Sequence, residues 1–131
     1  MALIVADSDV LIDALRGREQ AMARIANELE RSALATTTIT VFELLSGAKM
    51  AVNRRKIQKL FAAMRILGLD QPAAEAAAGV RQELEAKGIS IGMADYLIAG
   101  ICLVHSATLL TRNLEHFNRV PGLNVEQGDL A

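Results

Sequence analysis

Short apolar runs rich in β-branched residues alternate with longer segments of helical periodicity along the whole chain. The runs "ALIVAD", "LATTTI", "ILGL", "ATLLT" and "LNVE" have the length and composition of strands. Between them, apolar residues recur at helical spacing over residues 9–16, 18–31, 41–47, 53–65, 70–88 and 93–105, whereas "RNLEHF" is typical of a turn. This alternation predicts an α/β domain whose mainly parallel sheet is covered by helices on both faces.

Composition limits the classes of function that the chain can have. With 131 residues, 52% of them hydrophobic and 22% charged, we expect one globular domain over residues 1–131. A net charge of -1 offers no general attraction for nucleic acid, and 3% aromatic residues argue against broad base-stacking platforms. Any nucleic-acid binding therefore needs a local basic patch.

The start of the sequence and the single cysteine indicate a cytoplasmic protein. Cys102 is the single cysteine of the sequence, which excludes an intrachain disulfide. Its place inside the apolar segment 93–105 is typical of a small buried side chain, and a free cysteine is typical of a reducing compartment. The start "MALIVADSDV" lacks the basic region of a signal peptide. The apolar run after Asp95 is shorter than the roughly 20 residues of a membrane span, so we expect no membrane association.

Acidic and polar side chains follow the predicted strands where parallel sheets bind their ligands. Asp7 comes just after the first strand, and Glu43 is expected in the first turn of the helix after the second. Asp95 opens the apolar helix, and Thr111 and Asn113 lie at the end of "ATLLT" and just beyond it. Ligands of open α/β sheets bind beyond the carboxyl ends of the strands, so these oxygen-bearing side chains are expected to converge.

Each acid taken singly also has an ordinary role at the start of a helix. Thr40 and Glu43 have the spacing of a capping box, Asp95 could complement its helix dipole, and Asp7 could open a turn. These alternatives stay open for each residue. The joint pattern favours a shared site, because helix N-termini also direct side chains into the crevice at the sheet edge.

The chemistry of three converging carboxylates predicts a metal site. Close carboxylates repel one another and have raised pKa values, and a divalent cation removes that cost. Oxygen ligands without a Cys or His cluster favour Mg²⁺ or Mn²⁺ over zinc. A water bound to such an ion can become the nucleophile for phosphodiester hydrolysis.

Four segments together resemble the acidic signatures of the PIN domain, and more closely those of the VapC toxins of toxin–antitoxin pairs. They are "LIVADSDVLID" with Asp7, "TITVFELLSGA" with Glu43, "IGMADYLIAG" with Asp95, and "LLTRNLEHF" with Thr111 and Asn113. The resemblance extends over about residues 3–126. Each motif alone is weak, but the order of all four is specific.

The resemblance implies a three-layer α/β/α sandwich with the activity of a magnesium- or manganese-dependent endoribonuclease. The family positions matching Asp7, Glu43 and Asp95 hold the metal and are catalytic. A fourth, often acidic position corresponds to Asn113, with Thr111 in the same motif, so the fourth ligand is left open. Two further departures from the family pattern are Asp9, where Asn is usual, and His116, where an acid often precedes the Phe.

The resemblance also implies partners. They are an RNA substrate, a second copy in a homodimer, and a small VapB-like antitoxin that covers the active site and binds DNA, so that this chain meets DNA only through it. For dimerisation, the helical stripe Ile57, Leu60, Phe61 and Met64 is a candidate, although packing in the monomer core is the expected use.

RNA binding needs local positive charge, and hydrogen-bonding groups near the acids are candidates for orienting the substrate. Arg112 is favoured because it lies between Thr111 and Asn113, with Ser8 and His116 as further substrate contacts. A second basic cluster could be either an RNA contact or an ordinary solvated helix face: Arg54, Arg55, Lys56 and Lys59.

Three other functions remain as alternatives. A PIN nuclease with a housekeeping role would have no antitoxin, and a catalytically dead binding module is disfavoured by the intact acids at positions 7, 43 and 95. A phosphoacceptor receiver domain has a similar size and acids beside Mg²⁺. It needs a phosphorylatable Asp at the end of a middle strand and a later Lys, and "LLTRN" offers no Lys.

Overall fold

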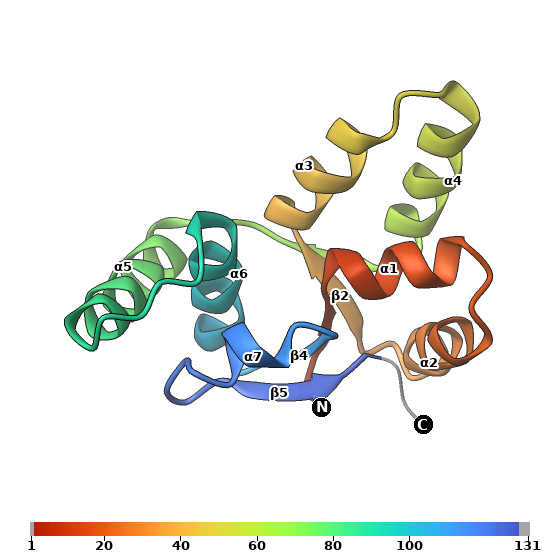
Figure 1. Ribbon diagram of the computed structural model, residues 1–131. Coiled ribbons are helices and arrows are strands. Elements are labelled where there is room, and N and C mark those ends of the chain that lie inside the picture. Colours follow the sequence, from red (N-terminus) through yellow and green to blue (C-terminus); the bar gives the residue numbers. More distant parts are fainter. Residues whose placement is uncertain (1, 129–131) are drawn as a thin grey trace.

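A parallel sheet forms the centre of the molecule in the computed structural model, which describes residues 2–128 (Figure 1). Its strands lie in the order β3-β2-β1-β4-β5, and every neighbouring pair is parallel. The strands are β1 (Ile4–Ala6), β2 (Leu34–Thr37), β3 (Arg65–Leu67), β4 (Thr108–Thr111) and β5 (Asn124–Gln127). The prediction of a mainly parallel α/β chain is confirmed.

Helices occupy most of the connections between these strands. The described helices are α1 (Ser8–Leu15), α2 (Glu19–Glu30), α3 (Thr38–Gly47), α4 (Ala51–Ala62), α5 (Gln71–Ala86), α6 (Met93–Val104) and α7 (Leu114–Phe117). In the described part of the chain, none of them is long and apolar enough to cross a membrane.

Successive residues of the central strands point to opposite faces of the sheet, and each face buries its own apolar cluster. Val5 and Leu109 pack with residues of α5 and α6, whereas Ala6 and Leu110 pack with residues of α1, α3 and α4. Figure 1 shows α5 and α6 side by side, apart from the group formed by α1 to α4. The molecule is therefore the expected three-layer α/β/α sandwich.

The side of the sheet on which the chain adds its strands changes between β1 and β4. From β1 the chain builds outward through β2 to β3, and it then returns to add β4 and β5 on the other side. The connections after β1 and β4 consequently diverge to either side, which opens a crevice at their carboxyl ends. Asp7 and Thr111 stand at that point, directly after β1 and at the last position of β4.

The start of α3 differs from the expectation. The second strand was expected over 34–39, but it ends at Thr37, whose hydroxyl accepts a hydrogen bond from the N–H of Thr40 at 3.1 Å and caps the helix. The prediction that Glu43 lies in the first turn is therefore wrong. Glu43 lies deeper in α3, so a Thr40–Glu43 capping box is excluded.

Two other segments settle alternatives that the sequence left open. The "RNLEHF" segment contains a short helix, α7, instead of a turn alone. The apolar stripe packs against the monomer core: Ile57 of α4 is buried, and Leu60, Phe61 and Met64, the last just beyond α4, are half-buried against the same cluster. Packing within the monomer is therefore the main use of the stripe.

Candidate functional site

Asp7 is the centre of the group of polar side chains at the ends of β1 and β4. It is the N-cap of α1, and its Oδ1 accepts the N–H of Ser8 at 2.8 Å. Its Oδ2 accepts a hydrogen bond from the hydroxyl of Thr111, also at 2.8 Å. Asp7 is 7% exposed and Thr111 is fully buried. The capping role and the predicted place in a site therefore belong to the same carboxylate.

Asp9 joins this group although the sequence did not place it among the site residues. Its Oδ2 accepts the backbone N–H of Arg112 at 3.1 Å and is 3.4 Å from the hydroxyl of Thr111. Its Oδ1 is buried without a hydrogen-bond partner in the described structure. The signal in the sequence was the spacing of Asp7 and Asp9, the N-cap and a first-turn residue of α1, which both approach the hydroxyl of Thr111.

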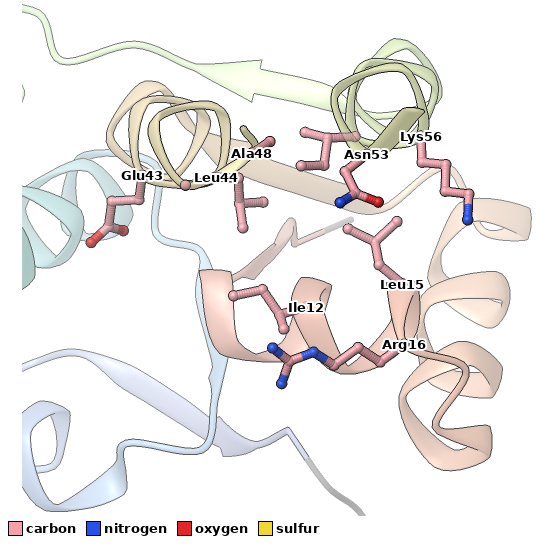
Figure 2. Close-up of a pocket in the computed structure, with 10 residues that line it drawn as sticks. Ile12, Leu15, Arg16, Glu43, Leu44, Ala48, Asn53 and Lys56 are labelled. Carbon is pink, nitrogen blue, oxygen red and sulfur yellow. The ribbon is translucent and has the colours of Figure 1, made fainter. Parts of the chain in front are cut away.

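Glu43 reaches the group from α3, which packs in the same helix layer as α1. Its carboxylate interacts with the Ser8 side chain and with the charges of Asp95 and Asp9. Its Oε1 is buried and has no hydrogen-bond partner in the described structure. Figure 2 shows the Glu43 carboxylate on the side of α3 away from Lys56.

Asp95 opens α6 as predicted, and it is paired with a histidine. Its Oδ2 lies 2.8 Å from Nδ1 of His116, and that nitrogen is 3.0 Å from Nδ2 of Asn113. An ionised carboxylate only accepts hydrogen bonds, so Nδ1 of His116 donates to an ionised Asp95. The N–H of Asn113 donates to the hydroxyl oxygen of Thr111 at 3.0 Å, which connects this pair to Asp7.

Arg112 lies beside the group, but its side chain points to a different acid. Its Nε is 3.0 Å from Oδ2 of Asp13, a buried residue of α1. The sequence analysis did not single out Asp13. The available signal was an acid in an otherwise apolar helical segment, four residues after Asp9.

Burial and mutual repulsion govern the charge of these acids. Burial is the largest cause that raises the pKa of Asp7 to about 6, and the charges of Asp9 and Asp95 add to it. Hydrogen bonds from Thr111 and Ser8 act in the opposite direction. Burial also raises the pKa of Asp9 and of Glu43, and the charge of Asp95 raises that of Glu43 further.

Cys102 lies near enough to this group for Asp7 to affect its ionisation. The thiol is buried, and burial together with the charge of Asp7 raises its pKa to about 12. A thiol of this kind stays protonated and acts as a small apolar side chain, as the sequence predicted.

The donor set fits a hard divalent cation. Buried oxygens of Asp9 and Glu43 lack hydrogen-bond partners in the part of the chain that the structure describes. Burial and the negative charges of Asp9 and Asp95 raise the pKa of Asp7, and a cation would compensate that negative charge. Within residues 2–128, no three acidic, histidine or cysteine side chains form a group that could hold an ion as they stand. Asp7 and Asp95 instead hold protein partners, Thr111 and His116.

A pocket of about 310 Å³ adjoins Glu43 between α1 and the α3–α4 pair (Figure 2). Apolar side chains line most of it, including Ile12, Leu15 and Leu44. Arg16 and Lys56 contribute positive charge, and of the basic cluster on α4 only Lys56 is among the lining residues. The pocket therefore joins an apolar surface to the edge of the acidic group.

Comparison with known proteins agrees with the fold. The model of the PIN domain family matches residues 4–123. The tRNA(fMet)-specific endonuclease VapC of Salmonella typhimurium is 27% identical over 130 residues, which cover 96% of this chain and 98% of that protein. Ribonuclease VapC10 of Mycobacterium tuberculosis is 32% identical over 115 residues, 88% of this chain and 86% of the relative.

The solved structures include a similar molecule in a complex. The crystal structure of DNA-bound VapBC from Salmonella typhimurium matches with a TM-score of 0.88 and 26% sequence identity, and it covers 98% of this chain and 99% of that one. The family model spans nearly the whole chain, and a relative above 30% identity is covered over most of its length. The chain therefore belongs to the PIN domain family and, within it, to the VapC ribonucleases of toxin–antitoxin systems.

Proposed function

We propose that this chain cuts RNA with a divalent cation, Mg²⁺ or Mn²⁺, held at the crevice between β1 and β4. The observation that carries the proposal is the partly buried acidic group, in which Asp7 has its pKa raised to about 6 and two buried carboxylate oxygens lack hydrogen-bond partners within residues 2–128. Such an arrangement is unfavourable in the free protein and becomes favourable when a cation supplies opposite charge.

Asp7, Glu43 and Asp95 are the proposed metal ligands and catalytic acids, with Asp9 close enough to join them. A bound divalent cation would polarise the scissile phosphate and activate a water for in-line attack. Thr111 fixes the Asp7 carboxylate through its 2.8 Å hydrogen bond. A polar side chain that orients a metal ligand in this way typically affects metal affinity and activity without touching the ion.

His116 and Asn113 take the place of the fourth acid. The imidazole Nδ1 holds one oxygen of Asp95, which leaves the other oxygen of that carboxylate for the ion. The other ring nitrogen of His116, Nε2, is the atom that is proposed to contact the substrate. Ser8 is proposed to orient Glu43, with which its side chain interacts.

The proposed partners are RNA, a second copy of the chain, and a VapB-like antitoxin, all in the cytoplasm. The likeness to a DNA-bound VapBC complex supports the antitoxin, which would make the contact with DNA. The pocket beside Glu43 suits an apolar antitoxin segment that carries acidic side chains, because Arg16 and Lys56 stand among its apolar lining. A segment seated there would also cover Glu43.

The proposal is tested by RNA cleavage with and without metal. Wild-type protein should cut transfer or messenger RNA with Mg²⁺ or Mn²⁺ and stop when EDTA is added. Asp95→Asn should lower the rate by about a hundredfold or more, because it removes a metal ligand and keeps the size of the side chain. Glu83→Gln, an acid of the exposed face of α5, is the control and should cut at the wild-type rate.

Two results would contradict the proposal: cleavage by Asp95→Asn at the wild-type rate, or wild-type cleavage that persists in EDTA. The toxin role has its own test. An antitoxin encoded beside the gene should bind the chain and suppress cleavage, and an intact nuclease without such a neighbour would indicate the housekeeping alternative.

A further inference from the structure

A buried acid of α1, Asp13, lies outside the group of carboxylates at the strand ends. Its side chain is 4% exposed and lies between two arginines. Nε of Arg112 is 3.0 Å from its Oδ2, and Nε of Arg18 is 3.5 Å from its Oδ1. A buried carboxylate is costly unless positive charge compensates it, and both guanidinium groups are at the surface.

Arg112 is held at two points by one face of α1. Its backbone N–H donates to Asp9, and its side chain meets Asp13 four residues further along the helix. Residues four apart share a helix face and are separated by about 6 Å along the axis. Within residues 2–128, Asp13 is the only acid at ion-pair distance from the Arg112 side chain.

The guanidinium of Arg112 is suited to contact RNA. The side chain is 41% exposed, so one part of it is fixed by Asp13 while the remainder faces solvent. A planar guanidinium matches the oxygens of a phosphate, and an arginine that is already held loses less freedom on binding. Asp13 lies one helical turn from Asp9, so the Arg112 guanidinium lies about that distance along α1 from the acidic group.

We propose that Asp13 is a positioning residue, which holds Arg112 where the guanidinium binds an RNA phosphate next to the cleavage site. The inference rests on the proposed ribonuclease function and assigns part of its substrate binding. Arg112 then contributes to binding the substrate and not to the chemical step.

If Asp13 acted only through its negative charge, removing it would change RNA binding in the opposite direction from that expected of a positioning residue. An acid near bound RNA repels it, so loss of that charge would strengthen RNA binding if Asp13 had no positioning role. The positioning role predicts weaker binding, because the released guanidinium must be ordered again when RNA binds. The sign of the change therefore separates the two accounts.

The experiment is a double-mutant cycle on a fluorescent oligoribonucleotide that the wild-type chain cuts. Arg112→Gln should raise KM about tenfold, and Asp13→Asn about threefold, with kcat within about twofold of wild type. In Arg112→Gln protein, adding Asp13→Asn should leave KM unchanged, since Asp13 acts through Arg112. Arg18→Gln removes the other arginine beside Asp13 and should leave KM at the wild-type value.

A second measurement follows the salt dependence of RNA binding. Loss of one phosphate contact to a single strand should reduce the slope of log Kd against log salt by about 0.7 for Arg112→Gln. If Asp13→Asn does not fold, Asp13→Glu replaces it in the same cycle. Its longer side chain displaces the guanidinium but keeps the charge, so KM should rise only when Arg112 is present.

The proposal is overturned if Asp13→Asn lowers KM or leaves it unchanged, or if its effect is the same with and without Arg112. A loss of kcat at constant KM would also overturn it. These outcomes differ from failure of the ribonuclease proposal, in which wild-type protein does not cut RNA or Asp95→Asn remains fully active.

Discussion

Asp7 combines helix capping with a place in the acidic group, and each of its oxygens has one of the two tasks. Oδ1 accepts the N–H of Ser8, and Oδ2 accepts the hydroxyl of Thr111. The cap fixes the rotation of the carboxylate, and the threonine fixes its direction toward β4. A ligand held in this way on rigid elements needs little further ordering when a cation binds.

Thr111→Val tests whether this hydrogen bond supports metal binding. The change keeps the shape of a fully buried side chain but removes the hydroxyl that contacts Asp7 and accepts from Asn113. Mn²⁺ affinity, measured by calorimetry, should fall about tenfold or more.

Thr36→Val is the matched control for Thr111→Val. Thr36 is equally buried, on β2, and its hydroxyl donates to the backbone oxygen of Ala6 at 2.8 Å. Both variants should lose about 1–2 kcal/mol of unfolding free energy. Only Thr111→Val should weaken Mn²⁺ binding, and equal affinities in the two variants would contradict the role given to Thr111.

The raised pKa of Asp7 predicts the pH dependence of stability in metal-free protein. The Asp7 carboxyl keeps its proton up to about pH 6 in the folded state, whereas the pKa of the free group is 3.8. The stabilising contribution of protonated Asp7 to the free energy of unfolding is therefore fully present below pH 3.8. It is lost as pH rises through about 6, and its size is about 3 kcal/mol.

Asp7→Asn should remove this contribution and make the metal-free chain more stable at pH 7 than wild type. Asn can still cap α1, because its side-chain oxygen also accepts hydrogen bonds. Urea unfolding at pH 5 and pH 7 in EDTA measures the effect. A wild-type protein that loses no more stability than Asp7→Asn between these values would show that the charge of Asp7 costs nothing in the fold.

The sequence predicted several residues of the acidic group and, for a physical reason, missed Asp9 in that group and Asp13 beside it. Asp7, Asp95 and Thr111 each stand at the end of a strand or the start of a helix, where local pattern gives their place. Asp9 and Asp13 are ordinary acids in a helix until the loop after β4 packs against α1. Contacts between residues about a hundred positions apart produce no recognisable pattern in the local sequence.

At the scale of elements, α6 holds Asp95 by packing closely on α5. A Cβ added at Gly100 of α6 would lie 2.5 Å from the backbone oxygen of Ala73 and 2.7 Å from Cβ of Ala77. The apolar pattern predicted α6 correctly, because its signal is long and continuous. The start of α3 was misplaced, since β-branched residues at 36–40 suit a strand and the cap by Thr37 decides otherwise.

Gly100→Ala should destabilise the protein by about 1–3 kcal/mol, because the backbone of α5 would have to move. Gly79→Ala is the matched control, as Gly79 lies within α5 and, apart from its chain neighbours and the adjacent backbone of α5, no described atom is within 4 Å of an added Cβ. That change should stabilise by about 0.5–1 kcal/mol through helix propensity. Thermal or urea unfolding measures both, and similar effects of the two changes would refute the close packing of α5 and α6.

At the scale of the whole molecule, strand order brings the acids together. Strands and helices alternate in a pattern that predicts a parallel sheet, but the order β3-β2-β1-β4-β5 comes from pairings between distant segments. Because β1 and β4 are neighbours, Asp7 and Asp9 meet the Thr111–Asn113 segment, and α3 and α6 bring Glu43 and Asp95 to the same crevice.

The central claim is that this crevice binds the catalytic cation, and anomalous diffraction from crystals grown with Mn²⁺ tests it most directly. The structure predicts an anomalous peak between the carboxylates of Asp7, Glu43 and Asp95, and no such peak in crystals of Asp95→Asn. A saturated crystal with no peak at these carboxylates, or with its Mn²⁺ bound only elsewhere, would contradict the account.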